Sequence, residues 1–301
     1  MPGLVSVVTA TYQRADTLPR LWDSLLEQGD ATIEWVVVDD GSDDGTGTLV
    51  RAWEREAPFP VRYTWQRNAG KHAAVNRGVE LATGEFCAVM DSDDWYAHGA
   101  IAKMLEYWDA IPAERRDGFA NVEGLCADPA GQVIGDRLPQ AVLDSNTFEI
   151  QAVHGVGGDK IGMYRRDVLL DHPFPEDLGW HVTAALVWNR IAARYATRFV
   201  DEIWAFKEYL PGGITDRDDV LHLQYPGAQL LFWREFAAMP RPMPRRTRLR
   251  AHAQTVRYSL HEGESTRELL ARSSSPPMTL LAWPVGKLVS VRDRARIRSA
   301  D

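Results

Sequence analysis

The sequence predicts an α/β protein with a mostly parallel central sheet and helices on both faces of that sheet. Short β-branched apolar runs alternate with segments whose apolar residues recur at helical spacing. The connections between these segments are short, which is typical of βαβ units and therefore of parallel strands. Polar residues follow the apolar runs, and the carboxyl edge of such a sheet is where ligands bind.

The first 115 residues contain four expected strands and three expected helices in alternation. We expect strands at residues 4–9, 33–38, 61–65 and 85–90, and helices at residues 18–26, 45–56 and 71–82. Asp16 and Thr17 precede the first helix, and both residue types cap helix N-termini. This part of the chain is therefore the predicted nucleotide-binding half.

The pattern changes after residue 115. The turn-rich tetrapeptide Asp128-Pro129-Ala130-Gly131 predicts a hairpin between residues 117–125 and 132–134. Helices are expected at 182–193 and 228–238, with a loop at 211–213 between them. We assign residues 116–240 to an acceptor-side half, so that residues 1–240 form one domain.

Prolines 240, 242 and 244 mark the end of that domain. Residues 241–301 form a predicted basic, helical extension, with a helix at 248–260 and a linker at 273–277. This extension contains 13 Lys and Arg against 5 Asp and Glu, so the chain's net charge of −8 divides into −16 for residues 1–240 and +8 for the extension.

The composition excludes several classes of protein. With 301 residues, 45% hydrophobic and 25% charged, the chain is long enough for a sizeable core and is neither disordered nor fibrous. Its two cysteines cannot form a disulfide framework and are typical of a reducing compartment. A net acidic chain is also a poor general nucleic-acid binder, because neutralising phosphates requires clustered Lys and Arg, so no nucleic-acid partner is expected.

We predict the location of the protein from two features that the sequence lacks, a signal peptide and a membrane-spanning segment. The first residues lack the pattern of a signal peptide, and no apolar stretch is long enough to span a bilayer. We therefore expect a cytoplasmic protein that is either free or bound at the inner face of the membrane.

The strongest chemical signal is Asp91-Ser92-Asp93-Asp94 directly after the fourth strand. Asp91 and Asp93 are separated by one residue and can face the same cavity. Carboxylate oxygens suit Mg²⁺ or Mn²⁺, and either ion can bridge a diphosphate. The alternative is a solvated acidic turn that caps the next helix.

Two other polar segments follow strands. Asp39-Asp40-Gly41-Ser42 can accept hydrogen bonds from a base or ribose, or can simply begin a helix. The segment Asn68-Ala69-Gly70-Lys71-His72 places a cation near a helix start, where it can meet a nucleotide or remain solvated.

Several ligand sites are excluded by missing motifs. The chain has no GxGxxG after its first strand, no phosphate-binding P-loop, no GxSxG elbow and no CxxC zinc spacing. Four scattered histidines, at positions 154, 172, 181 and 222, are interpreted as surface or structural residues, although one of them can complete a metal shell.

Taken together, these segments resemble a family-2 glycosyltransferase with the GT-A (nucleotide-diphospho-sugar transferase) fold. The matching segments are residues 5–14, 36–44, 68–78 and 88–94, in that order, with weaker similarity through residues 187–192 and 209–215 to about residue 238. The extension beyond residue 238 resembles no family that we can name.

The resemblance implies a nucleotide-sugar donor, usually UDP-linked, inversion at the anomeric carbon, a hydroxyl acceptor, and Mn²⁺ or Mg²⁺ as cofactor. The implied roles are a nucleotide site at Thr9, Tyr12 and Arg14, base binding by Asp39 with Lys71 nearby, ribose contact by Asp91 beside Ser92, and metal–diphosphate coordination by Asp93. The acceptor, whether a glycan, a lipid-linked molecule or a small metabolite, stays open.

The resemblance also implies a catalytic carboxylate four residues before the Trp of a Trp-Asn pair. Here that position is Ala184, four residues before Trp188, and alanine cannot accept a proton. We hypothesise either an inactivating change at Ala184 or a base displaced to Glu176 or Asp177, with His181 as a weaker option. The alternative functions are a catalytically silent sugar-nucleotide binding protein and a nucleotidyltransferase.

The basic extension has two interpretations. Residues 278–291 are largely apolar, and Arg292, Arg294, Arg296 and Arg298 follow them. Such a segment can lie on an anionic membrane surface. It can equally pack on the acidic domain or form a homodimer contact.

Overall fold

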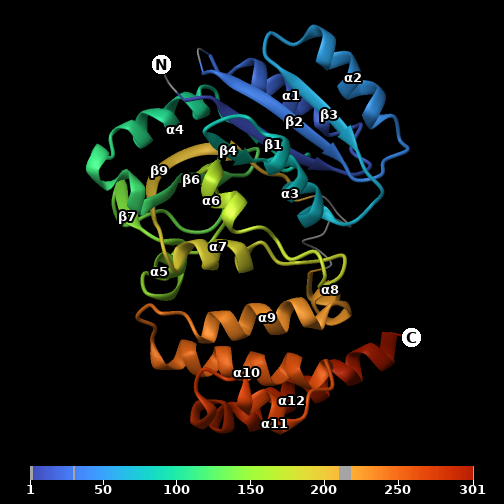
Figure 1. Ribbon diagram of the computed structural model, residues 1–301, viewed down its shortest axis with the longest axis vertical. Helices are drawn as coiled ribbons and strands as arrows, with labels where there is room; N and C mark the ends of the chain where they lie inside the picture. Colours follow the sequence, from blue (N-terminus) through green and yellow to red (C-terminus); the bar gives the residue numbers. More distant parts are fainter. Residues whose placement is uncertain (1–2, 30, 210–217, 301) are drawn as a thin grey trace.

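The computed structural model describes residues 3–29, 31–209 and 218–300. It shows a mixed α/β molecule in which one central sheet carries helices on both faces (Figure 1). A stack of helices from the last third of the chain lies at one end of the molecule, below the sheet in Figure 1. The fold class predicted from the sequence is confirmed.

The first half of the chain folds as alternating strands and helices. The elements are β1 (Val5–Thr11), α1 (Leu18–Leu26), β2 (Ile33–Asp39), α2 (Thr46–Glu56), β3 (Val61–Trp65), α3 (Lys71–Leu81), β4 (Phe86–Val89), β5 (Trp95–Tyr96) and α4 (Ala100–Asp109). All four expected strands and all three expected helices of this half are present, with ends that differ by one or two residues.

The second half contributes the remaining strands of the sheet. A 3-10 helix (Ala113–Gly118) leads into β6 (Phe119–Ala127), and β7 (Val142–Ser145), α5 (Thr147–Ala152), β8 (Lys160–Arg165), α6 (Arg166–Asp171), α7 (Ala185–Ala192) and β9 (Ala196–Phe206) follow. The turn at Asp128–Gly131 forms as predicted, because the Asp128 carboxylate accepts hydrogen bonds from the backbone of Ala130 and Gln132. The expected second strand is a single bridge between Ala127 and Val133.

The strand order in the described sheet is β3-β2-β1-β4-β8-β6-β9-β5, with β7 paired to β9. Strands β3, β2, β1 and β4 are parallel neighbours, and β6 and β9 are also parallel. Strand β8 runs antiparallel between β4 and β6. The carboxyl ends of β1, β2 and β4 therefore meet at one edge of the sheet, which carries the polar segments identified in the sequence.

Alternating residues of the parallel strands build a core on each face of the sheet. Val7 packs with α1, α2 and α4 on one face, whereas Val8 packs with α3, α6 and α7 on the other. Helix α3 approaches β1 closely at Gly78, where a Cβ would lie 2.3 Å from a methyl carbon of Val8. This close packing fixes the start of α3, and with it Lys71, at the carboxyl edge of the sheet.

The last third of the chain is helical. Its elements are α8 (Asp218–Gln224), α9 (Pro226–Ala237), α10 (Arg245–His261), α11 (Thr266–Ala271) and α12 (Pro276–Ala300). Figure 1 shows α9, α10 and α12 as successive layers leading away from the sheet. None of the helices in the described ranges has both the length and the apolar character that a membrane span requires.

The structure corrects two expectations about local structure. Helix α7 begins at Ala185 rather than Val182, so Ala184 is its N-cap. The predicted linker at 273–277 is shorter, because α12 already begins at Pro276. The boundary at Pro240 stays a prediction, since α9 on one side of it packs against α10 on the other. The expected loop at 211–213 lies outside the described residues.

Candidate active site

Three carboxylates cluster directly after β4. Asp91, Asp93 and Asp94 each offer an oxygen atom, and these oxygens lie within 4.8 Å of one another. The parallel pairing of β4 with β1 places the cluster at the ligand-binding edge of the sheet. Asp91 and Asp93 therefore lie close together, but only Asp91 of the two lines the neighbouring pocket, and their binding of a metal stays a prediction.

Three cations from distant parts of the chain surround this cluster. Lys71 Nζ lies 2.5 Å from an oxygen of Asp91, and Arg14 Nε lies 3.7 Å from an oxygen of Asp93. Lys207, just after β9, lies 3.1 Å from Asp94, 3.1 Å from Asp159 and 3.8 Å from Asp91. An anion bound at this edge would thus meet both the carboxylates and three cations.

Burial and charge act in opposite directions on the ionisation of these groups. Burial alone would raise the pKa of Asp91, but the charges of Lys71 and Lys207 outweigh it and hold this pKa below its usual value. Burial alone would lower the pKa of Lys207, but the surrounding aspartates raise it instead. The Lys207 ammonium and the Asp91 carboxylate therefore stay charged together at neutral pH.

Asp94 differs from its neighbours in ionisation. Burial, followed by the charge of Asp91, raises the pKa of Asp94 to about 7, although Lys207 opposes the shift. Two carboxylates this close disfavour a second negative charge unless a cation neutralises them.

The acidic cluster fits a divalent cation. Oxygen donors from carboxylates are the ligands that Mg²⁺ and Mn²⁺ prefer, and three of them converge here without any histidine or cysteine. Asp91 and Asp93 are the residues that would hold such an ion, with Asp94 close behind them.

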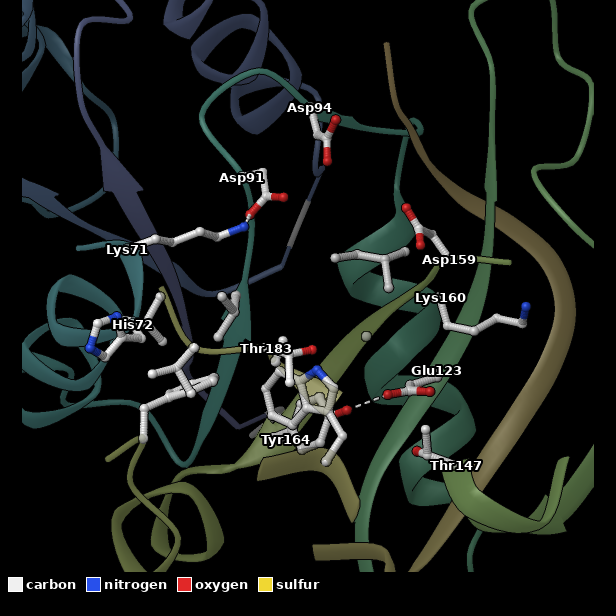
Figure 2. Close-up of a pocket in the computed structure, with 18 of the residues that line it drawn as sticks. Lys71, His72, Asp91, Asp94, Glu123, Thr147, Asp159, Lys160, Tyr164 and Thr183 are labelled. Atoms are coloured by element: carbon white, nitrogen blue, oxygen red, sulfur yellow. Dashed lines mark hydrogen bonds and ion pairs between the residues drawn. The ribbon is translucent and has the colours of Figure 1, made fainter. Parts of the chain in front are cut away.

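A pocket of about 410 Å³ opens beside the cluster (Figure 2). Its walls come from the start of α3, the end of β4, strands β6 and β8, helix α5, and the segment before α7. The lining residues that carry charge or a polar group are Lys71, His72, Asp91, Asp94, Glu123, Thr147, Gln151, Asp159, Lys160, Tyr164, Trp180, His181, Thr183, Trp188 and Lys207. A mixed polar and aromatic lining of this kind suits a sugar or another polyhydroxyl molecule.

Glu123 lies deep in this pocket and is 5% exposed. Its carboxylate accepts a hydrogen bond from the Tyr164 hydroxyl (Figure 2). It accepts a second one, at 2.9 Å, from the Asn121 amide. The Tyr164 ring stacks on Trp188, with ring centroids 4.7 Å apart. Burial raises the pKa of Glu123, against the lowering effects of Tyr164 and Lys160.

The residues predicted to contact the nucleotide are only partly at the surface. Tyr12 is 45% exposed and Arg14 is partly exposed, but Thr9 is fully buried and its hydroxyl accepts a hydrogen bond from the Trp35 indole. Ser92 is buried, and its carbonyl accepts a hydrogen bond from Thr17. Tyr12 is thus accessible to a ligand, and Arg14 is partly exposed but already lies beside Asp93, whereas Thr9 is buried within β1.

Asp39 is fully buried and already has two partners. Its carboxylate accepts hydrogen bonds from the Ser42 backbone at 2.8 Å and from the Tyr63 hydroxyl at 2.7 Å. Asp40 accepts hydrogen bonds from the backbone of Ala69 and Gly70, both at 2.9 Å. In this structure both aspartates shape the loops at the sheet edge, and base binding by Asp39 stays a prediction.

Gly70 joins this edge to the segment before α7. Its φ of +96° is unfavourable for other residues, and a Cβ there would lie 2.3 Å from the carbonyl oxygen of Trp180. The Trp180 indole donates a hydrogen bond to Asn68 at 2.6 Å. The segment that carries Ala184 is therefore held against the loop that carries Lys71.

The expected position of the base lies in the pocket, and so does His181, the weaker candidate replacement, but Glu176 and Asp177 do not. Ala184 and Thr183 line the cavity. Glu176 and Asp177 are exposed and absent from the pocket lining, and Glu176 accepts a hydrogen bond from Asn76 at 2.7 Å. The carboxylates that do line the pocket are Asp91, Asp94, Glu123 and Asp159.

Sequence reasoning missed Glu123, Asp159 and Lys207. Glu123 lies in β6 and Lys207 directly follows β9, and neither strand has a recognisable motif. Asp159 lies in a glycine-containing loop. All nine residues of β6 are buried, and its largely apolar composition could have indicated that Glu123 is buried too, but no local signal indicates which cavity it faces.

The described sheet, with an acidic cluster at its carboxyl edge, has the GT-A type of fold that the sequence predicts. Residues 6–118 match the sequence model of Glycosyl transferase family 2. The resemblance predicted from the sequence motifs is therefore confirmed over this part of the chain.

The chain is similar to curated proteins that are named as glycosyltransferases or as biosynthesis proteins. The chain is 28% identical over 214 residues to an uncharacterized glycosyltransferase of Nostoc sp., which covers 68% of this chain and 63% of the relative. It is 42% identical over 163 residues to the succinoglycan biosynthesis protein ExoO of Rhizobium meliloti, which covers 51% of this chain and 45% of that protein. The chain thus spans less than two thirds of either relative.

Solved structures support the fold. The S. aureus protein TarS in complex with UDP-GlcNAc superposes with a TM-score of 0.59 at 18% identity, over 92% of this chain and 79% of that one. The mannosyltransferase PcManGT from Pyrobaculum calidifontis, in complex with GDP-Man and Mn²⁺, superposes with a TM-score of 0.58 at 19% identity, over 100% of this chain and 84% of that one.

Proposed function

We propose that the protein transfers a sugar from a nucleoside-diphosphate sugar to an acceptor hydroxyl, with inversion at the anomeric carbon and with Mn²⁺ or Mg²⁺ as cofactor. The observation that carries the proposal is the convergence of Asp91, Asp93 and Asp94 beside a polar pocket of about 410 Å³. The three surrounding cations supply the positive charge that a diphosphate needs.

The donor is proposed to be a UDP-sugar. Family resemblance favours uridine, and TarS has been solved with UDP-GlcNAc, although PcManGT has been solved with GDP-Man. Tyr12, which is 45% exposed at the end of β1, offers a ring on which a base can stack. The diphosphate would then lie over Arg14 and Lys71, beside the acidic cluster.

The chain's own residues supply orientation and charge in this scheme. A divalent cation held by Asp91 and Asp93 would neutralise the negative charge that develops on the departing diphosphate. Lys71 and Arg14 stabilise the same oxygens by direct attraction. Lys207 holds Asp94 and Asp159 in place and so keeps the pocket side of the cluster rigid.

We propose Glu123 as the group that accepts the proton from the acceptor hydroxyl. It lines the same pocket as Ala184 and forms no ion pair among the described residues, whereas Asp91, Asp94 and Asp159 are all paired with lysine. Because burial raises its pKa, Glu123 is a stronger base than an exposed carboxylate. Its hydrogen bonds to Tyr164 and Asn121 fix its orientation.

The proposed function is tested first by donor binding. We expect UDP-sugars with Mn²⁺ to raise the melting temperature of the protein more than GDP- or dTDP-sugars do, and EDTA to remove the effect. If no nucleotide sugar stabilises the protein with either metal, the donor assignment is wrong. Stabilisation without any transfer or hydrolysis would identify a silent sugar-nucleotide binding protein instead.

The position of the base is tested by two substitutions. Glu123→Gln should lower kcat by about 10²–10⁴-fold, the usual contribution of a general base, while donor affinity stays unchanged. Ala184→Glu restores a carboxylate at the position where the family resemblance implies the base. A gain in turnover in this variant would show that the chain lacks its base. Normal turnover in Glu123→Gln would exclude our assignment.

A further inference from the structure

Helix α12 exposes its apolar residues instead of burying them. Leu280, Leu281, Val285, Leu288 and Val291 are 53–70% exposed. They account for five of the fourteen large hydrophobic side chains that are exposed in the described part of the chain. The other nine are scattered over the rest of the molecule, so the concentration on one helix requires an explanation.

These five residues share one side of the helix. Their separations of three, four, seven and eight positions bring them onto a single face. The exposed residues Pro284 and Ala295 fall on the same face by the same spacing. The result is an apolar stripe, defined here as residues 280, 281, 284, 285, 288 and 291.

The opposite face of α12 packs on α10 through small and polar residues. Gly286 lies against α10, where a Cβ would come 2.5 Å from the Ala253 carbonyl oxygen. Buried Asp293 accepts hydrogen bonds from Arg257 at 2.6 and 2.9 Å, and buried Thr279 bonds to His252 at 2.8 Å. The helix is therefore held in one orientation, with its stripe directed away from the protein.

The position of α12 leaves the stripe open. Helix α9 lies between the sheet and α10, and α10 lies between α9 and α12, so α12 belongs to the outermost layer (Figure 1). It packs mainly on α10 and makes a smaller contact with α11. The stripe thus faces outward at the end of the molecule that lies farthest from β2 and β3.

The charges around the stripe are of one sign. Lys287, Arg292, Arg294 and Arg296 are exposed on α12, and the one acidic residue in its described part, Asp293, is buried. Two copies of this helix would therefore bring cations together without an acidic partner. An anionic surface complements both the cations and the stripe between them.

We propose that the outer face of α12 binds the surface of an anionic lipid bilayer. The leucine and valine side chains enter the boundary between headgroups and acyl chains, and the flanking lysine and arginines contact lipid phosphates. The helix lies in the plane of the surface. This inference is independent of the proposed sugar transfer.

The test is co-sedimentation of the full-length chain with vesicles. We expect binding to vesicles of phosphatidylglycerol and phosphatidylcholine at low salt, and at least tenfold weaker binding to pure phosphatidylcholine or at high salt. The variant Leu281→Gln/Leu288→Gln should lower the affinity for anionic vesicles at least tenfold. Both leucines are exposed, so the variant should keep the circular dichroism spectrum and the melting temperature of the parent.

A matched control separates the stripe from general surface hydrophobicity. Leu26 and Leu170 are 46% and 40% exposed on helices of the sheet region, and Leu26→Gln/Leu170→Gln should leave vesicle binding unchanged. The proposal is wrong if the parent chain does not bind anionic vesicles, or if both double variants bind equally well. It is also wrong if the stripe variant converts a dimer to a monomer in analytical ultracentrifugation without changing vesicle binding.

Discussion

At the scale of single residues, the candidate site depends on charges that only function together. Asp91, Asp93 and Asp94 would repel one another without Lys71, Arg14 and Lys207 around them. The same arrangement prepares the site for a cation and a diphosphate. A bound cation would take the place of the lysine and arginine charges beside the aspartates, and a diphosphate would take the place of the carboxylates beside those basic residues.

We expect Asp93→Asn to abolish the response to metal. The substitution removes one negative charge from the cluster, so Mn²⁺ and donor should no longer raise the melting temperature, and turnover should fall about 10²–10³-fold, as for other lost electrostatic groups. Asp23→Asn, an exposed position on α1, serves as the control. An unchanged Mn²⁺ response in Asp93→Asn would place the metal elsewhere.

At the scale of elements, a buried carboxylate connects β1, β2 and the end of α3. Glu34 is 1% exposed and accepts hydrogen bonds from Ser6 at 2.6 Å and from the Thr83 backbone at 2.6 Å, with Arg62 at 3.3 Å. Burial alone would raise the pKa of Glu34, but these donors outweigh burial and lower it.

This lowered pKa predicts a pH dependence of stability. A carboxylate whose folded pKa is depressed stabilises the fold above its unfolded pKa, near 4.5, and this contribution is lost as the pH falls toward the folded pKa. Glu34→Gln should lower the free energy of unfolding by about 1–3 kcal/mol at pH 7. Urea titrations of both proteins at pH 7 and pH 4 should show the difference shrinking at pH 4; an equal difference at both values would contradict the assignment.

The two cysteines are predicted to be unreactive in the folded protein. Cys87 in β4 and Cys126 in β6 are both free and buried, and burial raises the pKa of each thiol to about 12. Since the thiolate is the reactive form, iodoacetamide at pH 8 should leave both intact in the native protein and modify both in urea. Intact-mass spectrometry reads out the adducts, and rapid alkylation of the native protein would show that a strand is accessible.

At the scale of the whole molecule, the chain combines an acidic sheet region with a basic helical region. The division into −16 and +8 corresponds to the sheet with its carboxylate site and to the helices that end in α12. The basic residues do not simply neutralise the acidic region, because those on the outer face of α12 are directed away from it.

The attachment of α12 depends on a buried ion pair. Asp293 is 4% exposed and bonds to Arg257 and, at 3.1 Å, to His261. Because Asp293→Ala leaves Arg257 without its buried partner, we expect a loss of about 3 kcal/mol in stability. In Asp293→Ala, hydrogen exchange should accelerate in α10 and α12 but not in β1 or β2. The control Arg292→Ala, at an exposed position, should change neither the stability nor the exchange of these helices.

The sequence by itself determined the α/β class, the alternation of elements over the first 115 residues and the edge of the sheet where Asp91 and Asp93 meet. It could do so because apolar periodicity and strand-end motifs are local, and parallel pairing brings strand ends to one edge. The placement of Glu123, Asp159 and Lys207 was decided only by the tertiary structure. Glu123 bonds to Tyr164, which is 41 residues away in the chain, and Lys207 pairs with Asp159 and with the distant Asp91 and Asp94. The same holds for α12: its composition was visible in the sequence, but only packing on α10 determined which of its faces is buried and which is open.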